Sequence, residues 1–476
     1  STVADFKPIE DDKDGKYSKF VLRFSLETDQ GREVAGDNIV VLFHPERAPK
    51  VRRLTETPPP GEHPRVFFTK ADLPELRRRA EASPVAKRAV EMMRTRSKGL
   101  DNPDSVYQAI LADRDFSIRP VWGSKGHGFF TPVMEAAYVN WLGEAGQTNT
   151  EKMQELARVF SEACQESLTW YRPNYYNVLC HDVIWPVGIA YDLLHDYMDE
   201  AGRAEARHLI SRMTSHRYSK GPYEPPQGNA TNHRGSHDHI FATTLAIEGE
   251  EGFDEGVIDC IEKKDAIWLT QYGIFESGLP HEGYAYFNHG MSWMSMTILA
   301  NTRRKNRENL AETTRFYRAV SETPFRLLDK DGIRSHHDVV EDTETGAGLV
   351  PNPPNQIMIA KYLWPEDRTI DYVWAQLSEN LLKETREDRF GFLHAVFAEP
   401  VRYPDQTMTE AAGTLNTAHF CPDRGFMNAR NSWDEDSLRL NLRCRMDKYY
   451  VGHVHSDCNA FELWGRNRMW FMDRGK

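Results

Sequence analysis

The chain has 476 residues, several times the usual length of one domain, so we expect two or three domains and a core that needs no disulfide bonds. Its 59 Lys and Arg against 71 Asp and Glu give a net charge of −12, which argues against general binding to nucleic acid or to a membrane surface, because both require a basic face. The mean hydropathy is −0.63, and no run approaches ~18 apolar residues, so the sequence predicts no membrane span.

The N-terminal part of the chain predicts strands. Residues 17–26 partly alternate between polar and apolar side chains, and the apolar run 38–43 follows a turn that contains glycine. This pattern is typical of a hairpin or a small β module. Residues 57–61 (Thr-Pro-Pro-Pro-Gly) then predict a linker. We therefore expect a short β-rich segment at residues 1–60.

Residues 63–385 carry helical periodicity. The first helix begins near Thr69, a capping residue followed by a first-turn proline. Further helices are predicted near residues 131–144, 151–168, 178–198, 202–215, 237–248, 255–272, 289–302, 308–322, 355–364 and 370–384. Successive hairpins of similar helices close into a toroid or stack as a solenoid. Because no fixed sequence period is evident, we predict an incomplete (α/α) helical toroid.

Residues 386–476 predict an antiparallel sheet. The expected strands lie near residues 392–397, 425–430, 437–444, 460–464 and 469–472. Leu438, Leu440 and Leu442 alternate with polar residues, which predicts a sheet with one face in water. The last predicted strand lies at the end of the sequence, and an unpaired sheet edge is unfavourable. We therefore expect the start of a β-sandwich that a further C-terminal polypeptide segment completes.

The first candidate site is residues 229–239 (Asn-Ala-Thr-Asn-His-Arg-Gly-Ser-His-Asp-His), which open a predicted helix. The positive N-terminus of a helix and neutral Asn and His donors together suit a bound carboxylate. A capped helix start with solvated polar residues fits the same pattern about equally well. The residues alone leave both interpretations open.

The second candidate site is residues 282–290 (Glu-Gly-Tyr-Ala-Tyr-Phe-Asn-His-Gly), again where a loop leads into a helix. A tyrosine can transfer a proton if a neighbour lowers its pKa. Taken alone, this stretch is better explained as an aromatic anchor in the core.

The third candidate site is residues 452–457 (Gly-His-Val-His-Ser-Asp). On an extended chain, His453, His455 and Asp457 share one face, and histidines two residues apart with a carboxylate are suited to zinc. Asp473 ends the next predicted strand and could join them. A polar strand end is the alternative.

Together, these stretches resemble the heparinase II/III-like superfamily, which includes heparinases, alginate lyases, other uronate polysaccharide lyases and dermatan sulfate epimerase. The likeness spans roughly residues 64–476. It is carried by residues 188–195 (Gly-Ile-Ala-Tyr-Asp-Leu-Leu-His), Asn232-His233, residues 245–249 (Leu-Ala-Ile-Glu-Gly), Glu282-Gly-x-x-Tyr286, and His453-x-His455-x-Asp457 with Asp473-x-Gly475. The fold that it implies is a helical toroid followed by an antiparallel β-sandwich, with the cleft between them.

The resemblance also implies roles for single residues. His233 would neutralise a uronate carboxylate with Asn232 beside it, Tyr286 would transfer a proton, and His453 would be the second acid or base. His455 and Asp473 would be two ligands of a divalent metal, expected to be zinc, whose third ligand lies beyond this sequence. Further substrate contacts are expected from Arg234, His237, Glu282 and His289. His237 stands where many relatives carry Asn, His289 stands where many carry Tyr, and Tyr284 is a nearby rival to Tyr286.

The expected activity is a secreted or periplasmic polysaccharide lyase that cleaves a uronate-containing acidic polysaccharide by β-elimination. Donors on the carboxylate would stabilise the enolate that forms when the C5 proton leaves, and a second group would protonate the departing O4. The alternatives are a uronate C5-epimerase on the same scaffold, a toroidal glycoside hydrolase using Asp182 and Asp238, a metallo-hydrolase built on the His-x-His stretch, and a non-catalytic glycan-binding protein.

Overall fold

A computed structural model of the chain divides into two compact units, Ser1–Pro49 and Lys50–Lys476, and we describe each by itself. In the first unit the structure describes the strands and residues 48–49. In the second unit it describes residues 50–101, 130–144, 146–170, 180–219, 238–281, 284–304, 309–329, 332–333, 355–383, 391–422, 425–434, 436–444, 458–465 and 468–471.

The first unit contains one antiparallel sheet around its longest strand, β3 (Ser18–Glu27). The other strands that pair with β3 are β1 (Thr2–Val3), β2 (Lys7–Pro8), β4 (Glu33–Val34) and β5 (Asn38–Phe43). The pairing of β3 with β5 confirms the predicted hairpin strands at residues 17–26 and 38–43.

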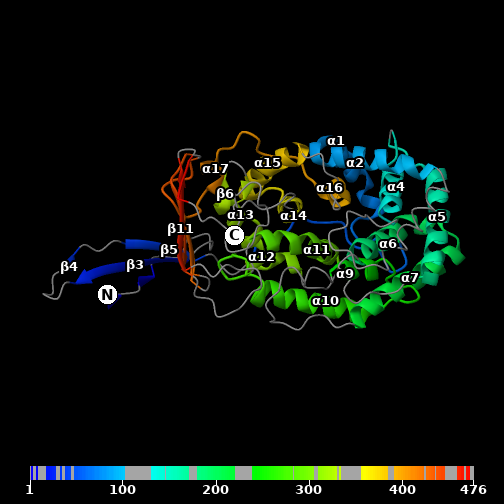
Figure 1. The fold of residues 1–476 in the computed structure, drawn as a ribbon, viewed down its shortest axis with the longest axis horizontal. Coiled ribbons are helices and arrows are strands. Elements are labelled where there is room, and N and C mark those ends of the chain that lie inside the picture. The colour runs from blue at the N-terminus through cyan, green and yellow to red at the C-terminus, as the bar shows by residue number, and fades with distance from the viewer. Residues whose placement is uncertain are drawn as a thin grey trace. The chain divides into compact units, whose positions relative to one another are not determined.

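The second unit is mostly helical (Figure 1). A capping box at Thr69 opens the first helical turn, as the sequence predicts, because the Thr69 hydroxyl accepts a hydrogen bond from Ala71 N and the Asp72 carboxylate accepts one from Thr69 N. The α-helices are α1 (Leu73–Ala82), α2 (Pro84–Ser97), α4 (Phe130–Leu142), α5 (Thr150–Trp170), α6 (Cys180–Leu194), α7 (Glu200–Ser219), α9 (Asp238–Leu245), α10 (Glu255–Ile267), α11 (Tyr284–Thr302), α12 (Thr314–Val320), α13 (Glu322–Leu327), α14 (Asn355–Leu363), α15 (Arg368–Lys383), α16 (Gly391–Phe397) and α17 (Met408–Ala412).

Six of these helices contact one another in chain order. Helix α4 packs against α6, α6 against α9, α9 against α11, α11 against α14, and α14 against α16. The series returns to its start, because Tyr138 of α4 and Phe392 of α16 pack edge to face with their ring centroids 5.2 Å apart. We call α4, α6, α9, α11, α14 and α16 the linked helices. This order of contacts favours the predicted toroid, whose closure stays a prediction.

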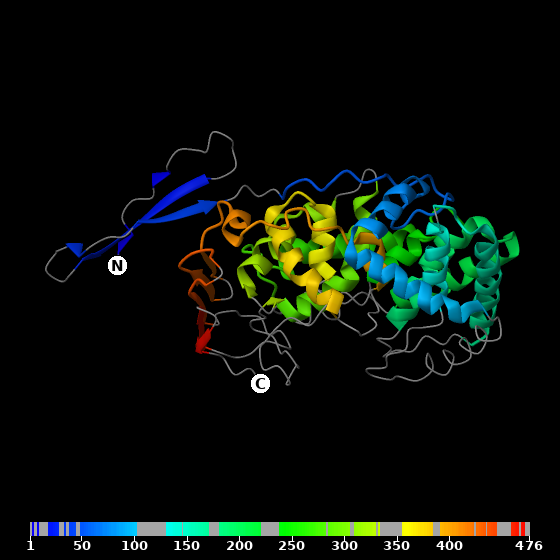
Figure 2. The same cartoon turned by 90° about the horizontal axis from the view of Figure 1, so that it is seen from above.

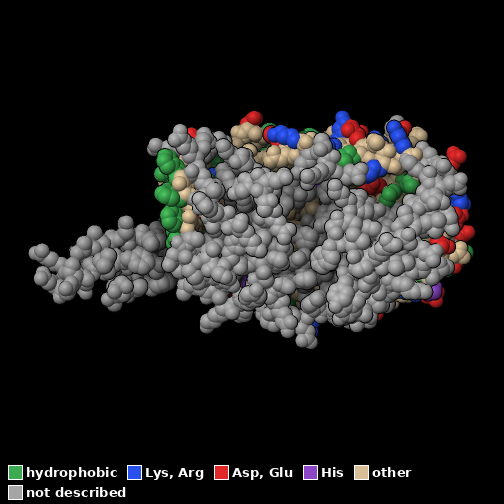
Figure 3. Space-filling view, viewed as in Figure 1, with side chains coloured by type: hydrophobic (Ala, Val, Ile, Leu, Met, Phe, Trp, Pro, Cys, Tyr) green, Lys and Arg blue, Asp and Glu red, His purple; other side chains and the backbone are tan. Residues whose placement is uncertain are grey.

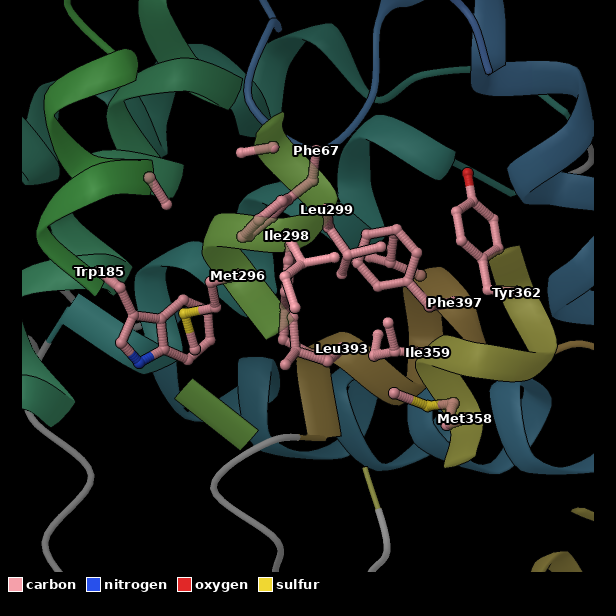
Figure 4. Close-up of a cluster of buried hydrophobic side chains, with 14 of the residues drawn as sticks. Phe67, Trp185, Met296, Ile298, Leu299, Met358, Ile359, Tyr362, Leu393 and Phe397 are labelled. Atoms are coloured by element: carbon pink, nitrogen blue, oxygen red, sulfur yellow. The ribbon is translucent and has the colours of Figure 1, made fainter. Parts of the chain in front are cut away.

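Apolar side chains fill the space among the linked helices. Figure 4 shows Trp185 from α6, Met296, Ile298 and Leu299 from α11, and Met358, Ile359 and Tyr362 from α14 converging with Phe67, Leu393 and Phe397. All ten side chains are buried. Full burial of such side chains contributes about 1.5–3 kcal/mol each, so this cluster is a main source of the stability of the helical part.

One segment, which we call the strap (residues 50–68), runs past the C-terminal ends of the linked helices. Its backbone donates hydrogen bonds to the carbonyl oxygens of Leu363, Arg303 and Glu248, at the ends of α14, α11 and α9. Such bonds satisfy carbonyl groups that a helix end leaves unpaired. The predicted linker at residues 57–61 is therefore part of a fixed segment.

A glycine lets the strap approach α9. Gly249 has φ +84°, and a Cβ added there would lie 2.2 Å from Pro60 Cβ. This positive φ and close approach explain the glycine that ends the 245–249 stretch.

The C-terminal sheet has the strand order β12-β11-β10-β9-β8, all antiparallel. Its strands are β8 (Ala418–Cys421), β9 (Phe426–Arg430), β10 (Arg439–Cys444), β11 (Cys458–Gly465) and β12 (Arg468–Phe471). Four of the five expected strands are present, and β8 was not predicted. The expected strand at residues 392–397 is wrong, because this run is helix α16 and is buried throughout. A short, continuous apolar run does not distinguish a buried strand from a buried helix.

The polar face of this sheet is the buried one. The guanidinium groups of Arg430 and Arg439 both donate hydrogen bonds to the carbonyl oxygen of Leu328, just after α13, and Asn441 is 1% exposed. Positive side chains are favourable there because the last carbonyl groups of a helix carry partial negative charge. The face bearing the alternating leucines is therefore the outer one.

The outer face of the sheet is apolar. Phe420, Phe461 and Phe471 are 60%, 46% and 55% exposed, and Figure 3 shows hydrophobic side chains gathered over this sheet. An apolar exposed face is typical of a sheet that packs against another layer. The further polypeptide segment expected to complete this domain stays a prediction. Among the described helices, none combines the length and the apolar character needed to cross a membrane.

Candidate functional site

The C-terminal ends of all six linked helices lie at the strap. Phe68 stacks on Trp141 near the end of α4, Phe67 packs against Phe397 at the end of α16, and the backbone N–H groups of residues 65 and 66 bond to Asp192 near the end of α6. With the three bonds given above, all six helices have their C-terminal ends at the strap. Their N-terminal ends therefore lie away from it. Figure 2 shows the strap along one side of the helices.

Two of the candidate stretches are joined to the N-terminal ends of neighbouring helices. Residues 229–237 lead into α9 at Asp238, and residues 282–283 lead into α11 at Tyr284. Because α9 and α11 pack together and both end at the strap, their starts lie on the same side of the molecule. Each stretch thus adjoins the positive end of the helix that it opens.

Helices α9 and α11 begin at different distances from the strap. Glu248 and Arg304, which form an ion pair at 2.8 Å, mark the strap ends of the two helices. A rise of ~1.5 Å per residue places Asp238 about 15 Å and Tyr284 about 30 Å from that pair. Tyr286 and His289 therefore lie on turns of α11 that extend beyond the start of α9.

Most of the predicted site residues lie outside the described residues. These are Asn232, His233, Arg234, His237, Glu282, His453, His455 and Asp473. Tyr286 and His289 have described backbones in α11, but their side chains lie outside the description. The same holds for Asp182 in α6 and Asp238 in α9. The roles expected of all these residues stay predictions.

Tyr284 does not fit a proton-transfer role. Its side chain is 1% exposed, and its hydroxyl donates a hydrogen bond to the carbonyl oxygen of Ala319 at 3.3 Å. Burial raises the pKa of Tyr284 far above its usual value, so its proton is held more tightly than in water. Tyr284 is a core anchor, which leaves Tyr286 as the tyrosine candidate of the Glu-Gly-x-x-Tyr stretch.

Trp185 is also a core residue, so its ring does not face a sugar-binding cleft. It is 2% exposed and packs near Phe392, with ring centroids 5.9 Å apart.

The Tyr191-Asp192 pair of the 188–195 stretch has a structural position at the strap. The Asp192 carboxylate accepts hydrogen bonds from the backbone N–H groups of Arg65 and Val66 at 2.9 Å, and from His63 Nδ1 at 2.7 Å. The Tyr191 hydroxyl donates to Glu250 at 2.5 Å. These residues connect the strap to the ends of α6 and α9 and lie at the helix ends opposite to Tyr286.

Sequence reasoning missed a cluster of metal-ligating side chains. Within the part of the chain that the structure describes, His63, His195 and Glu250 have ligand atoms that all lie within 4.8 Å of one another. The sequence separates these residues by more than a hundred positions in one case, and no short motif joins them. Of the three, only His195 belongs to a stretch that the sequence singled out, residues 188–195.

The sequence matches no family profile and no curated protein. The chain shows distant similarity to solved structures titled heparinase III: one with methylated lysines is 12% identical, with a TM-score of 0.43, covering 75% of this chain and 52% of that chain. Another is 14% identical, with a TM-score of 0.40, covering 72% and 49%. A heparan sulfate lyase from Pedobacter heparinus is 11% identical, with a TM-score of 0.39, covering 85% and 63%. The chain thus spans about half to three-fifths of the length of these structures.

Proposed function

We propose that this protein is a polysaccharide lyase that cleaves a uronate-containing acidic polysaccharide by β-elimination. The observation that carries the proposal is that α9 and α11 start on the same side of the molecule. Asn232-His233 and Glu282-Gly-x-x-Tyr286 lead into the N-terminal ends of α9 and α11, which pack together and start on the same side of the molecule. The partial positive charge of helix N-termini favours a carboxylate-bearing substrate there.

The reaction begins at C5 of the uronate, whose proton is weakly acidic. Hydrogen bonds from His233 and Asn232 to the carboxylate stabilise the negative charge that develops as this proton leaves. Tyr286 and His453 are the acid and base: one removes the C5 proton, and the other, or the same tyrosine, protonates O4 as the C4–O4 bond breaks. Which group does which depends on whether C5–H and O4 lie on the same side of the ring.

The remaining predicted residues have supporting roles in this proposal. Arg234, His237, Glu282 and His289 contact the substrate. His455 and Asp473 hold a divalent metal, expected to be zinc, which orders the sheet near His453 and takes no part in bond breaking. We also propose that the linked helices belong to an incomplete (α/α) toroid, and that the protein is secreted or periplasmic.

The experiment that tests this proposal is a product screen over alginate, glycosaminoglycans and ulvan. A lyase releases products with an unsaturated uronate, which absorbs in the ultraviolet, and their masses lack one water relative to hydrolysis products. Saturated products with a new reducing end would instead indicate a glycoside hydrolase.

A C5-epimerase is distinguished by the same screen run in deuterated water. Removal of the same proton by the same residues followed by return of a proton to C5 would give deuterium uptake without chain cleavage. Binding with neither cleavage nor deuterium uptake on any uronate polysaccharide would contradict the proposed lyase.

A further inference from the structure

The strap end of the molecule contains a compact His-His-Glu cluster, contributed by the strap, by the turn after α6 and by the turn after α9. The side chains of His63, His195 and Glu250 are 1%, 15% and 10% exposed. The two imidazole rings stack, with centroids 4.0 Å apart and planes 26° apart. We propose that these three side chains bind one divalent transition-metal ion of the zinc type, at a site separate from the metal expected in the sheet.

Both histidines are oriented as zinc ligands usually are. His63 Nδ1 lies 2.7 Å from Asp192 Oδ1, and His195 Nδ1 lies 3.2 Å from Asp196 Oδ1. The other ring nitrogen of each points to the same carboxylate: His63 Nε2 is 3.0 Å from Glu250 Oε1, and His195 Nε2 is 3.7 Å from Glu250 Oε2. A carboxylate on the far ring nitrogen fixes the tautomer and orientation of a metal-binding histidine.

The spacing of the ligand atoms suits zinc. Bonds of about 2.0–2.2 Å in tetrahedral geometry put neighbouring ligand atoms about 3.3–3.5 Å apart. His63 Nε2 lies 3.0 Å from Glu250 Oε1, and the ligand atoms of all three residues lie within 4.8 Å of one another, so modest shifts of the side chains bring them to tetrahedral spacing. Two histidines and one glutamate leave a fourth position for water, and the partial exposure of His195 provides the way in.

The glutamate is held in place by other donors. Glu250 Oε2 accepts a hydrogen bond from the Tyr191 hydroxyl at 2.5 Å and one from Arg207 Nη1 at 3.2 Å. Because both donors bond to Oε2, Oε1 is the oxygen that would bind the metal. The positive charge of Arg207 weakens the attraction for a cation, and the charges of Asp192 and Asp196 oppose this effect.

Zinc binds neutral imidazole and carboxylate groups, and these are the groups that His63, His195 and Glu250 offer in this cluster. Metal binding here would tie the strap to the ends of α6 and α9.

Metal content and thermal unfolding test this proposal. The metal-free protein, the variants His195→Ala and Glu250→Gln, and the control His208→Ala, which changes an exposed histidine on α7, are dialysed against Zn²⁺. We expect the protein and the control to bind one Zn²⁺ more per chain than the two variants, and to gain in Tm on addition of Zn²⁺ by more than the variants do. Equal metal content and equal gains in Tm in all four would overturn the proposal.

A third variant tests whether the metal binds at this cluster even if the first two variants fold poorly. His195→Cys keeps a ligand at the same position but changes it to a thiolate. With Co²⁺, the folded variant should show a thiolate-to-cobalt charge-transfer absorption that the protein itself lacks. A folded His195→Cys variant that gives no such absorption would contradict the proposed site.

Discussion

Replacement of His63 by glutamine tests how the strap is held at neutral pH. His63 is 3% exposed and lies between the carboxylates of Asp192 and Glu250. Although burial alone lowers its pKa, these two partners raise the pKa from 6.5 to about 8. A shift of about 1.5 units corresponds to about 2 kcal/mol of stabilisation by the protonated ring, at 1.36 kcal/mol per unit.

The sign of this effect follows from linkage. Because the pKa is higher in the folded state, the stabilisation is fully present below pH 6.5 and is lost as the pH rises through about 8. Between pH 6 and pH 9, the protein should therefore lose about 2 kcal/mol more of its free energy of unfolding than His63→Gln does.

Urea unfolding at the two pH values, with a metal chelator present, measures this difference. His208→Gln is the control, because His208 is exposed on α7, and it should behave like the protein itself. If His63→Gln and the unchanged protein lost equal free energy between the two pH values, the proposed ion pairs of His63 would be refuted.

Three further substitutions follow from the packing. Gly188→Ala would place a Cβ 2.7 Å from Thr243 Cα, which would force α6 and α9 apart and lower stability by about 1–3 kcal/mol. Gly391→Ala is the control, because its Cβ would meet only the end of a side chain at 3.7 Å, and it should change the thermal midpoint little. Lys361→Met would remove the ion-pair partner of the fully buried Asp371 and leave its carboxylate only the backbone N–H donors of residues 402 and 403. We expect a cost of about 3 kcal/mol, and an unchanged Tm would contradict this. Phe471→Ser, on the outer face of the sheet, should alter stability by no more than about 0.5 kcal/mol but reduce binding of an apolar dye, and undiminished dye binding would show that this face is covered.

The sequence predicted those helices best that have a clear apolar stripe or cap, and it missed α2 and α17. The expected helix at residues 151–168 is α5, and the one at residues 370–384 is α15. Both have strong amphipathic patterns, and such local signals survive in the folded chain. The toroidal arrangement was inferred from the number and similar length of the predicted helices, and it stays a prediction.

The errors come from features that depend on tertiary contacts. The run 392–397 is apolar without interruption, so its helix in the core was not distinguishable from a buried strand. The alternating leucines did not show which face of the sheet is covered. The covered face carries Arg430 and Arg439, which donate hydrogen bonds to the carbonyl oxygen just after α13. An alternating pattern identifies two faces, but only the neighbouring element decides which of them is covered.

The sequence could suggest candidate site residues only where they form short stretches. The Asn-His and Glu-Gly-x-x-Tyr stretches are short and contiguous in sequence, so the sequence alone could suggest them. The cluster of His63, His195 and Glu250 depends on the strap crossing the ends of α6 and α9. No local pattern predicts that crossing.

The most direct test of the proposed β-elimination compares two tyrosines on the same helix turn. Initial rates of unsaturated-product formation are measured for the protein, Tyr286→Phe and Tyr284→Phe on the uronate polysaccharide that gives the highest rate. Removing an acid–base group lowers kcat by about 10²–10⁴-fold, which is expected for Tyr286→Phe. Tyr284→Phe should lose only the buried bond to Ala319, about 1 kcal/mol of stability, and keep its rate. A Tyr286→Phe variant as active as the protein itself, or a larger loss of kcat in Tyr284→Phe, would contradict the account.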